Sequence, residues 1–430
     1  MTPTPAQMIV TTLGEPTIDS PLYVADSHTR FTDDSRRVLY DVEWEGDAEP
    51  LAMGFERAGA RRKIFFDPAK SKAAIVTCGG LCPGINNVVR NLFYMLHGDY
   101  GVPEVLGIRF GFAGLNPEDG VPPIRLSGSI VERIHHQGGT ILGTSRGPQD
   151  PHSTVDFLIS EGVNLLFCIG GDGTQRGAHA IWQEVARRKA KIAVVGIPKT
   201  IDNDIRYCHR SFGYLTAVAE AEKVIDCAHT EARSVHNGIG LVKLMGREAG
   251  FITAAAVIAS GEVNFAMIPE VPFKLEGPQG LLAKLERRLQ YRDHAVIVVA
   301  EGAGQDLFDH VKVEYDKSGN RKLQDIGPLL KERIVKHFAS LGNPVDVKYI
   351  DPSYNIRSVP ANAADSLLCE ELARQAAHAA MAGKTDVLIG LWQNRTVHVP
   401  LAMATGQAKR LRPDSELWAS VLSTTDQEKW

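Results

Sequence analysis

The chain has 430 residues, a formal net charge of −4 and a hydrophobic content of 44%. This length suffices for two domains or one large α/β unit, and the hydrophobic content is that of an ordinary folded domain. The slightly acidic balance provides no polybasic surface, so neither nucleic acid nor an anionic membrane is expected as a partner.

The six cysteines indicate neither a disulfide framework nor a zinc site. Cys78 and Cys82 are four residues apart, but no second pair of Cys or His comes after them at zinc-like spacing. We interpret the cysteines as reduced packing residues. The chain starts without a charged, apolar leader, and no apolar run reaches the length of a membrane-spanning helix. The sequence therefore predicts a cytoplasmic protein.

Residues 1–71 differ in composition from the rest of the chain, because they are rich in Pro, Thr, Asp and Arg and contain only short apolar pieces. We expect them to form an N-terminal extension that wraps the surface or an interface. From residue 72 onward, apolar runs alternate with helical patterns. Strands are expected at 73–77, 105–108, 163–169, 191–197, 239–245, 263–268 and 295–300, and helices at 87–95, 174–188 and 281–292.

This alternation predicts an α/β fold with mainly parallel sheets built from βαβ units. The pattern forms two blocks, 72–213 and 214–356, which we interpret as two Rossmann-like lobes of similar size with a cleft between them. Ligands of such sheets bind at the carboxyl ends of the strands. The candidate motifs all lie at predicted positions of this kind.

Two glycine-rich loops are candidates for binding an anion. The first contains Gly79 and Gly80 and joins a predicted strand to a helix, where the backbone can approach a phosphate closely. A tight turn without a ligand explains it equally well. The second loop, 138–147, ends in Arg146 and Gly147. Arg146 could bridge phosphate oxygens, although a surface arginine is the simpler interpretation of this residue alone.

The loop 170–174 (GGDGT) is a stronger signal, because it places one carboxylate in a glycine turn at the end of a strand. Asp172 could hold Mg²⁺ on a phosphate, and Gly173 leaves room for a nucleotide phosphate chain. The alternative is that Asp172 caps the following helix. Because GGDGT loops recur in NAD kinases and lipid kinases, the loop indicates a phosphate donor better than it names an acceptor.

The loop 198–204 (PKTIDND) comes after the next predicted strand. Asp202 is two residues from Thr200 and two from Asp204, so on an extended segment the three side chains would share a face. A carboxylate near Mg²⁺ and a hydroxyl can act as the base in phosphoryl transfer. An acidic turn is the alternative, but it explains neither the threonine nor the nearby GGDGT loop.

Three later segments also lie at predicted loop positions. They are Met245-Gly246-Arg247, the loop containing Glu301, and the segment 354–357. Arginine suits a phosphate and glutamate suits sugar hydroxyls, so together the segments favour a sugar phosphate as acceptor. Taken singly, each residue is more typical of a surface ion pair.

In their order along the chain, these motifs resemble those of the phosphofructokinase family, from about residue 72 to about residue 401. The matching pieces are Gly79-Gly80 with Pro83-Gly84 and Asn86, the loop 138–147, GGDGT, TIDND, MGR, the Glu301 loop and the segment 354–357. Residues 242–247 (VKLMGR) and 57–59 (RAG) are most similar to the ATP-using branch shared by plants, trypanosomatids and some bacteria.

The resemblance implies a 6-phosphofructokinase of glycolysis, which transfers the γ-phosphoryl group of Mg-ATP to the 1-hydroxyl of fructose 6-phosphate and yields fructose 1,6-bisphosphate and ADP. It implies that 72–213, completed by about 357–410, is the nucleotide-binding lobe, and that 214–356 is the sugar-phosphate lobe. It also implies a homo-oligomer, either a homodimer or a homotetramer.

Residue by residue, the resemblance makes Asp202 the base, places Thr200 and Arg247 in the catalytic set, and makes Asp172 the Mg²⁺ ligand. The residues implied to bind the nucleotide are Gly79, Gly80, Arg146, Gly147, Gly171, Asp172, Gly173 and Thr174. The residues implied to bind the sugar phosphate are Thr200, Ile201, Asp202, Met245, Gly246, Arg247, Glu301, Lys348, Tyr354, Asn355, Ile356 and Arg357.

Gly173 and Lys199 bear on the identity of the donor. Pyrophosphate-using relatives carry Asp at the first position and Lys at the second. An Asp at 173 would fill the space of the nucleotide α-phosphate, whereas Lys199 only adds charge, so we predict ATP. The alternatives are a reversible pyrophosphate-dependent enzyme, an NAD-type or lipid-type kinase sharing the GGDGT loop, and a non-catalytic regulatory subunit.

One position departs from the short bacterial relatives. Gly238 stands where they carry an arginine that reaches the sugar phosphate of a neighbouring subunit. The sequence therefore does not predict that contact between subunits.

Overall fold

The computed structural model describes residues 3–24, 29–43, 46, 53–116, 121–147, 149–308, 314–315 and 322–427. Contacts between residues divide the chain into two compact units. The first comprises Met1–Thr200, Ile205–Gly213 and Ser358–Ala408, and the second comprises Ile201–Asp204, Tyr214–Arg357 and Lys409–Trp430.

The first unit is built on a nine-stranded sheet with the order β3-β4-β17-β16-β10-β9-β6-β7-β8. The five central strands, from β16 to β7, are mutually parallel. Their apolar runs are buried almost without interruption, as expected for a sheet that is covered on both faces. The strands are β3 Arg37–Leu39, β4 Gly54–Arg57, β6 Lys72–Thr77, β7 Glu104–Ile108, β8 Ile124–Arg125, β9 Leu165–Gly170, β10 Ala193–Pro198, β16 Val387–Trp392 and β17 Arg395–Pro400.

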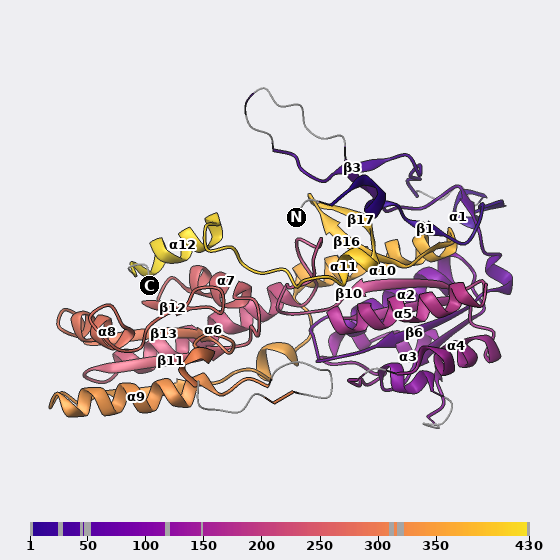
Figure 1. The fold of residues 1–430 in the computed structure, drawn as a ribbon. Helices are drawn as coiled ribbons and strands as arrows, with labels where there is room; N and C mark the ends of the chain where they lie inside the picture. Colours follow the sequence, from indigo (N-terminus) through magenta and orange to yellow (C-terminus); the bar gives the residue numbers. More distant parts are fainter. Residues whose placement is uncertain are drawn as a thin grey trace. The chain divides into compact units, whose positions relative to one another are not determined.

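Helices α2, α5 and α10 pack along this sheet (Figure 1). The apolar positions Ala178, Ile181 and Val185 of α5 are spaced by three or four residues and are all buried, as the periodicity predicts. The helices of this unit are α1 Pro21–Val24, α2 Ile85–Phe93, α3 Gly128–Val131, α4 Pro151–Ser160, α5 Asp172–Arg187, α10 Ala363–Met381 and α11 Leu401–Ala404.

Part of the N-terminal segment extends the main sheet. Strand β4 pairs antiparallel with β17, so that Glu56 lies opposite His398 and Arg57 opposite Val397. Strand β3 then pairs antiparallel with β4 at the edge. Two small antiparallel pairs accompany it, β1 Thr11–Thr12 with β15 Lys384–Thr385, and β2 Ile18–Asp19 with β5 Lys63–Ile64.

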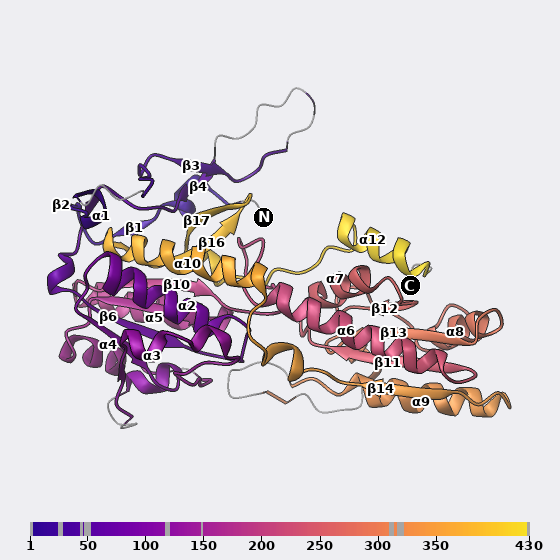
Figure 2. The ribbon, with the colours of Figure 1, turned by 180° about the vertical axis from the view of Figure 1, so that it is seen from behind.

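The second unit contains a four-stranded parallel sheet with the order β12-β13-β11-β14. Helices α6 and α9 lie beside β11 and β14 in both views (Figure 1 and Figure 2). The elements are α6 Tyr214–Arg233, β11 Gly238–Leu244, α7 Phe251–Ser260, β12 Phe265–Met267, α8 Leu281–Leu289, β13 His294–Ala300, α9 Ile326–Ser340, β14 Asp346–Ile350 and α12 Glu416–Thr425. The core includes Ile239, Leu241, Ile297, Val299, Leu330 and Phe338.

The C-terminal segment from Lys409 onward is fastened to the second unit by polar contacts. The carboxylate of Glu270 accepts hydrogen bonds from the backbone of Gly250 and Leu411. The side-chain amide of Gln427 accepts from the backbone N–H of Ala266 at 2.7 Å and donates to its carbonyl at 3.3 Å. Gln427 therefore imitates a further strand at the edge of β12.

The observed architecture confirms the predicted fold class, since parallel sheets and covering helices form both units. The strand predicted at 163–169 is found at Leu165–Gly170, and that at 191–197 is found at Ala193–Pro198. Within the described parts of the chain, no helix combines the length and the apolar character needed to cross a membrane.

Candidate active site

The two acidic loops begin side by side at one edge of the first unit's sheet. Strands β9 and β10 are parallel neighbours, with Ile169 opposite Ile197 and Gly170 opposite Pro198. The backbone N–H of Lys199 also donates to the carbonyl of Gly170 at 3.0 Å. Carboxyl ends of adjacent parallel strands are the usual place for a ligand in α/β folds, and the GGDGT loop starts there.

A buried glutamine on α5 ties these two strand ends together. The side-chain amide of Gln175 donates to the carbonyl of Gly170 at 2.9 Å and to that of Ile197 at 3.2 Å. A Cβ atom at Gly196 of β10 would lie 2.1 Å from Oε1 of Gln175, so the position has no room for a side chain. The sequence motif did not single out Gln175. Its polar side chain in the first turn after GGDGT was the available signal.

Asp172 is the first residue of α5, directly after the N-cap residue Gly171. Its carboxylate forms an ion pair with Arg176 one turn later. Asp172 therefore does not occupy the N-cap position that the alternative interpretation gave it. A negative charge in the first turn is favourable with the helix dipole, and the half-buried carboxylate stays at the rim of the loop.

The glycines of this loop differ in whether packing within the protein requires them to lack a side chain. A Cβ at Gly170 would lie 2.1 Å from Oγ1 of Thr174, so packing alone excludes a side chain there. A Cβ at Gly173 would meet only Nη2 of Arg176, at 3.9 Å. The fold therefore does not require a glycine at position 173, and the open space in front of it is available to a ligand.

The loop after β6 joins the same group. The backbone N–H of Gly79 donates to the carbonyl of Ser145 at 3.0 Å. The ammonium group of Lys199 donates to the carbonyl of Gly80 at 2.6 Å. Gly79 has φ +83°, a conformation that favours glycine. The loops containing Gly79, Gly80 and Ser145 thus lie against the end of β10, as the predicted donor-binding set requires.

Arg146 and Gly147 continue that loop. Arg146 is exposed and makes no hydrogen bond or ion pair with the residues that the structure describes. Gly147 has φ +105°, which again favours glycine. The guanidinium group of Arg146 is therefore available to an external anion.

The segment 200–204 leaves the sheet in a bend. The carbonyl of Thr200 accepts from the hydroxyl of the buried Ser211 at 2.7 Å. Asn203 has φ +54°, in the left-handed region. The segment is therefore not a continuous extended strand, and the simple alternation expected for Thr200, Asp202 and Asp204 does not describe it. Asp202 is half-buried, and the carbonyl of Asp204 accepts from the backbone of Lys409 at 2.7 Å.

In the second unit, the MGR and Glu301 loops lie side by side, because β11 and β13 are parallel and end together at Leu244 and Ala300. The backbone N–H of Glu301 donates to the carbonyl of Leu244 at 2.9 Å, and that of Gly302 donates to Gly246 at 3.1 Å. A Cβ at Gly302 would lie 1.9 Å from the carbonyl oxygen of Arg247. This close approach brings Met245, Gly246 and Arg247 next to Glu301.

Positively and negatively charged side chains lie next to one another around these two loops. Burial raises the pKa of Glu301, and the positive charges of Arg247 and Lys243 offset only part of that effect. Lys243, on β11, is buried and lies 2.9 Å from Asp325 and 2.8 Å from Asp351. Burial opposes its charge, but the hydrogen bonds that it donates to these carboxylates outweigh that effect and raise the pKa of Lys243.

The segment 354–357 forms a short 3₁₀ turn, Asn355–Arg357. Tyr354 is 73% exposed, and the guanidinium carbon of Arg357 lies 4.9 Å from the centre of its ring. Nε of Arg357 is buried and has no hydrogen-bond partner in the described structure. Ile356 is fully buried, so its side chain packs in the core.

Lys348 is engaged elsewhere. On β14 it lies opposite Gly240, near the middle of β11, and its ammonium group is 2.8 Å from the carboxylate of Asp346. The hydrogen bond to Asp346 raises its pKa. Lys243, which sequence reasoning did not select as a site residue, is the lysine whose charge acts on Glu301.

Comparison with known proteins decides the family. A model of the phosphofructokinase family matches residues 72–380. The chain belongs to the phosphofructokinase family. Among its relatives, the ATP-dependent 6-phosphofructokinase of Borreliella burgdorferi is 46% identical over 97% of this chain and 96% of its own length. ATP-dependent 6-phosphofructokinase 7 of Arabidopsis thaliana is 45% identical over 97% and 85%, and the Trypanosoma brucei brucei enzyme is 44% identical over 93% and 83%.

Solved structures support the phosphofructokinase fold. A pyrophosphate-dependent phosphofructokinase from Marinobacter aquaeolei superposes with a TM-score of 0.67 at 20% identity, covering 84% of this chain and 92% of that one. A phosphofructokinase from Saccharomyces cerevisiae gives 0.63 at 23% identity, covering 78% and 45%. These neighbours agree with the predicted fold, and the plant and trypanosomatid relatives confirm the predicted branch.

Proposed function

We propose that this phosphofructokinase transfers the γ-phosphoryl group of ATP to the 1-hydroxyl of fructose 6-phosphate in glycolysis, giving fructose 1,6-bisphosphate and ADP. The observation that carries the proposal is the similarity of 44–46% over nearly the whole chain to enzymes named ATP-dependent 6-phosphofructokinase. The motifs for both the donor and the acceptor are present in this sequence.

The donor phosphates would be held by the first unit. Backbone N–H groups of Gly171 and Gly173 at the start of α5 are suited to phosphate oxygens, since a helix N-terminus attracts anions. Thr174 belongs to the same predicted set, although its backbone N–H donates to the carbonyl of Gly171 at 2.9 Å. Arg146 would add a planar pair of hydrogen-bond donors. The glycines 79, 80 and 147 would let the backbone come close to the nucleotide.

Magnesium fits Asp172. Among the described residues, no three His, Cys, Asp or Glu side chains gather as a metal-binding group. Mg²⁺ on a nucleotide commonly takes only one or two protein carboxylates, with phosphate oxygens and water completing its shell. Asp172, half-buried at the rim of GGDGT, supplies one such carboxylate. When bound, the ion would neutralise charge that develops on the transferred phosphoryl group.

The acceptor would be held by the second unit. Arg247 and Arg357 would bind the 6-phosphate of the sugar, and Glu301 would accept hydrogen bonds from its hydroxyls. Met245, Gly246, Ile201, Tyr354 and Asn355 would shape the surrounding surface. Lys348 belongs to this predicted set, although its observed partner is Asp346.

Asp202 would accept the proton of the 1-hydroxyl as that oxygen attacks phosphorus, and the donor oxygen leaves with ADP. Thr200, two residues before it in the chain, would orient the hydroxyl. Arg247 would hold the sugar so that the oxygen and the phosphorus are in line.

Pyrophosphate is the second candidate for the donor, because Lys199 is the residue found in pyrophosphate-using relatives. The open space at Gly173 favours ATP, since only a bare position accommodates the α-phosphate. A coupled assay of fructose 1,6-bisphosphate production, with ATP and pyrophosphate as alternative donors, tests this choice. We expect turnover with ATP alone. Turnover with pyrophosphate alone would overturn the donor, and phosphorylation of NAD instead of the sugar would overturn the function.

We also propose a homo-oligomer, either a dimer or a tetramer, in the cytoplasm. The family resemblance supports this assembly. Light scattering on the purified chain tests it, because a mass of one chain would contradict it.

A further inference from the structure

A cavity of about 720 Å³ in the first unit is lined by an unusual number of arginines. This volume is typical of a pocket for a small molecule. The cavity lies between the N-terminal segment, α10 and the start of β17. Its lining residues are Thr29, Arg30, Thr32, Arg36, Arg57, Ala58, Gly59, Ala60, Met95, Arg374, Gln375, His378 and Arg395. None of them belongs to the proposed donor or acceptor set.

The charge of this arginine pocket is not balanced by its own lining. Five arginines and no acidic residue are among the lining residues. Glu370 forms an ion pair with Arg374, and Glu371 acts on Arg57 from nearby. In the part of the chain that the structure describes, five arginines of the lining therefore face the carboxylates of Glu370 and Glu371.

Arg57 shows the consequence of this imbalance. It is half-buried and donates to the carbonyl and the hydroxyl of Thr396, the latter at 2.7 Å. Burial and the like charges of Arg395, Arg36 and Arg30 lower its pKa, while Glu371 opposes them. A bound anion would relieve this repulsion, because it places negative charge between the guanidinium groups.

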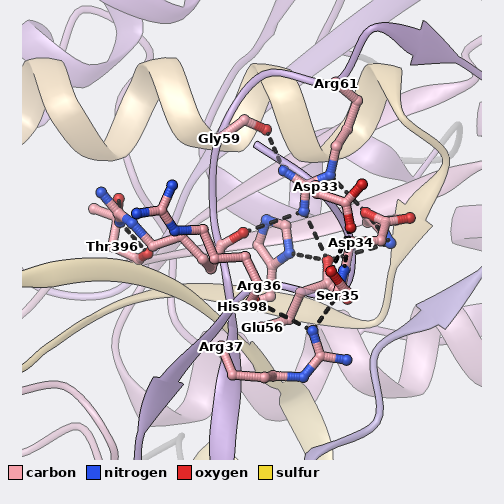
Figure 3. Close-up of polar contacts among 12 residues, drawn as sticks. Asp33, Asp34, Ser35, Arg36, Arg37, Glu56, Gly59, Arg61, Thr396 and His398 are labelled. Atoms are coloured by element: carbon pink, nitrogen blue, oxygen red, sulfur yellow. Dashed lines mark hydrogen bonds and ion pairs between the residues drawn. The ribbon is translucent and has the colours of Figure 1, made fainter. Parts of the chain in front are cut away.

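The turn 57–61, part of which lines the pocket, is held by a partly buried ion cluster, which Figure 3 shows around Arg61. The guanidinium of Arg61 lies 2.6 Å from Asp34 and 3.0 Å from Glu56. It also donates to the carbonyls of Gly59 at 2.8 Å and Arg57 at 3.1 Å. Arg61 thereby fixes the turn that presents Arg57 to the cavity.

Glu56 is fully engaged in that cluster and cannot neutralise the pocket. Its carboxylate lies 2.9 Å from Nδ1 of His398 and 3.2 Å from Nζ of Lys384. Burial opposes its ionisation, but the hydrogen bond from His398 and the charges of Lys384 and Arg61 outweigh it and lower the pKa of Glu56 to about 2. The carboxylate is therefore ionised and already paired.

A tight backbone contact closes one side of the cavity. The backbone N–H of Thr32 donates to the carbonyl of Ala60 at 2.8 Å. A Cβ at Gly59 would lie 2.3 Å from Oγ1 of Thr32, so a glycine is needed for the two segments to approach. The arginines are therefore carried on an ordered frame, and little rearrangement is needed to bind a ligand.

Gln375 adds a different kind of contact. Its Oε1 atom is buried and has no hydrogen-bond partner in the described structure. An amide oxygen accepts hydrogen bonds, so a matching ligand would carry a hydroxyl or amino group in addition to its anionic groups. A multiply phosphorylated sugar or nucleotide combines both features.

We propose that the arginine pocket binds a small, multiply phosphorylated anion, with Arg30, Arg57 and Arg395 on the phosphates and Gln375 on a hydroxyl or amino group. Several arginines around one small cavity provide the planar donors that phosphate groups prefer. The volume of the hollow, about 720 Å³, favours a small molecule over a flat contact with a second copy of the chain.

Calorimetric titration of the full chain tests the proposal, with inorganic tripolyphosphate as the probe and EDTA present so that Mg²⁺ does not support binding at the donor site. We expect one tripolyphosphate per chain and at least a tenfold loss of affinity in the R30Q/R395Q variant. The matched control is R125Q/R133Q, which removes the same charge at exposed arginines outside the pocket and outside the Arg61 cluster. It should bind as the unmodified chain does.

A second titration assigns Gln375. Q375L should weaken binding of fructose 1,6-bisphosphate, which carries hydroxyls, and leave tripolyphosphate binding unchanged. Both sets of variants should keep the thermal midpoint and the basal turnover.

Three outcomes would overturn the proposal. The unmodified chain fails to bind tripolyphosphate, R30Q/R395Q binds it as tightly as the control, or R30Q/R395Q instead changes the oligomeric mass. The last result would assign the arginines to a contact between copies. Because the probe contains no sugar acceptor and the readout is binding, failure of the proposed function would not decide this test.

Discussion

The proposed donor and acceptor halves of the active site are built in different ways. In the first unit the proposed donor half consists mainly of backbone, because Gly79, Gly80, Gly171 and Gly173 let the main chain come close to a ligand at the strand ends. In the second unit the acceptor half consists of charged side chains that two parallel strands carry to their common end. A backbone site is sensitive to added atoms, and a side-chain site is sensitive to lost charge.

Removal of the proposed base should have the largest effect, because Asp202 is proposed to accept the proton in the chemical step itself. We expect D202A to lower kcat by about 100- to 10,000-fold, the range for a general base. Affinity for ATP should change little, since the donor half is intact. Steady-state turnover and equilibrium ATP binding measure the two quantities. D204N is the matched control, and an equal loss of both quantities in D202A would indicate a structural role.

Adding atoms to the donor half should have the next largest effect. G173D places a carboxylate where we propose nucleotide phosphate to bind, and like charges in contact cost several kcal/mol. We expect kcat/KM for ATP to fall by about 100-fold. The fold should persist, because the nearest atom to a Cβ there is 3.9 Å away.

G173A, which adds a methyl group without charge, is the control and should lose much less activity. If G173D used ATP as well as the unmodified chain does, position 173 would not discriminate the donor.

Removing charge from the acceptor half should act on the sugar alone. R247Q should raise KM for fructose 6-phosphate by about 10- to 100-fold, because a hydrogen bond to a charged group is worth about 1.5–3 kcal/mol. KM for ATP should stay within about twofold. Initial-rate kinetics with each substrate varied separates the two. A comparable rise in both values would contradict the division of labour between the halves.

The smallest expected effect concerns Glu301, whose pKa is raised by burial. A carboxyl group with a raised folded-state pKa costs stability at neutral pH, and that cost disappears as pH falls below its ordinary value. E301Q should therefore raise the thermal midpoint at pH 7 by about 1–3 °C and weaken sugar binding. Thermal melts at pH 7 and pH 4 check the sign, because the gain should vanish at pH 4.

Much of the fold was predictable, because strands buried on both faces leave continuous apolar runs such as 163–169 and 191–197. The order of the strands was not. Strand β4 pairs with β17, whose residues lie about 340 positions later, and no local pattern encodes such a pairing.

The sequence predicted the parts of the candidate site that a backbone turn forms. It was less informative about side chains whose position depends on the register between two strands. The glycines of GGDGT predict a turn from the sequence alone, and the structure places that turn beside the end of β10. Two lysines on neighbouring strands were harder to tell apart. The register of β14 against β11 puts Lys348 opposite Gly240, while Lys243 stands one residue from the end of its strand. Sequence alone does not give that register.

The glutamine at position 427 has a consequence for how the protein stays dispersed. Strand β12 is the outer strand of its sheet, and an uncovered outer strand offers its backbone groups to other chains. By occupying both backbone groups of Ala266, Gln427 blocks that template. The C-terminal segment thereby protects the sheet against edge-to-edge aggregation. Its loss would first appear as aggregation during refolding rather than as weaker catalysis.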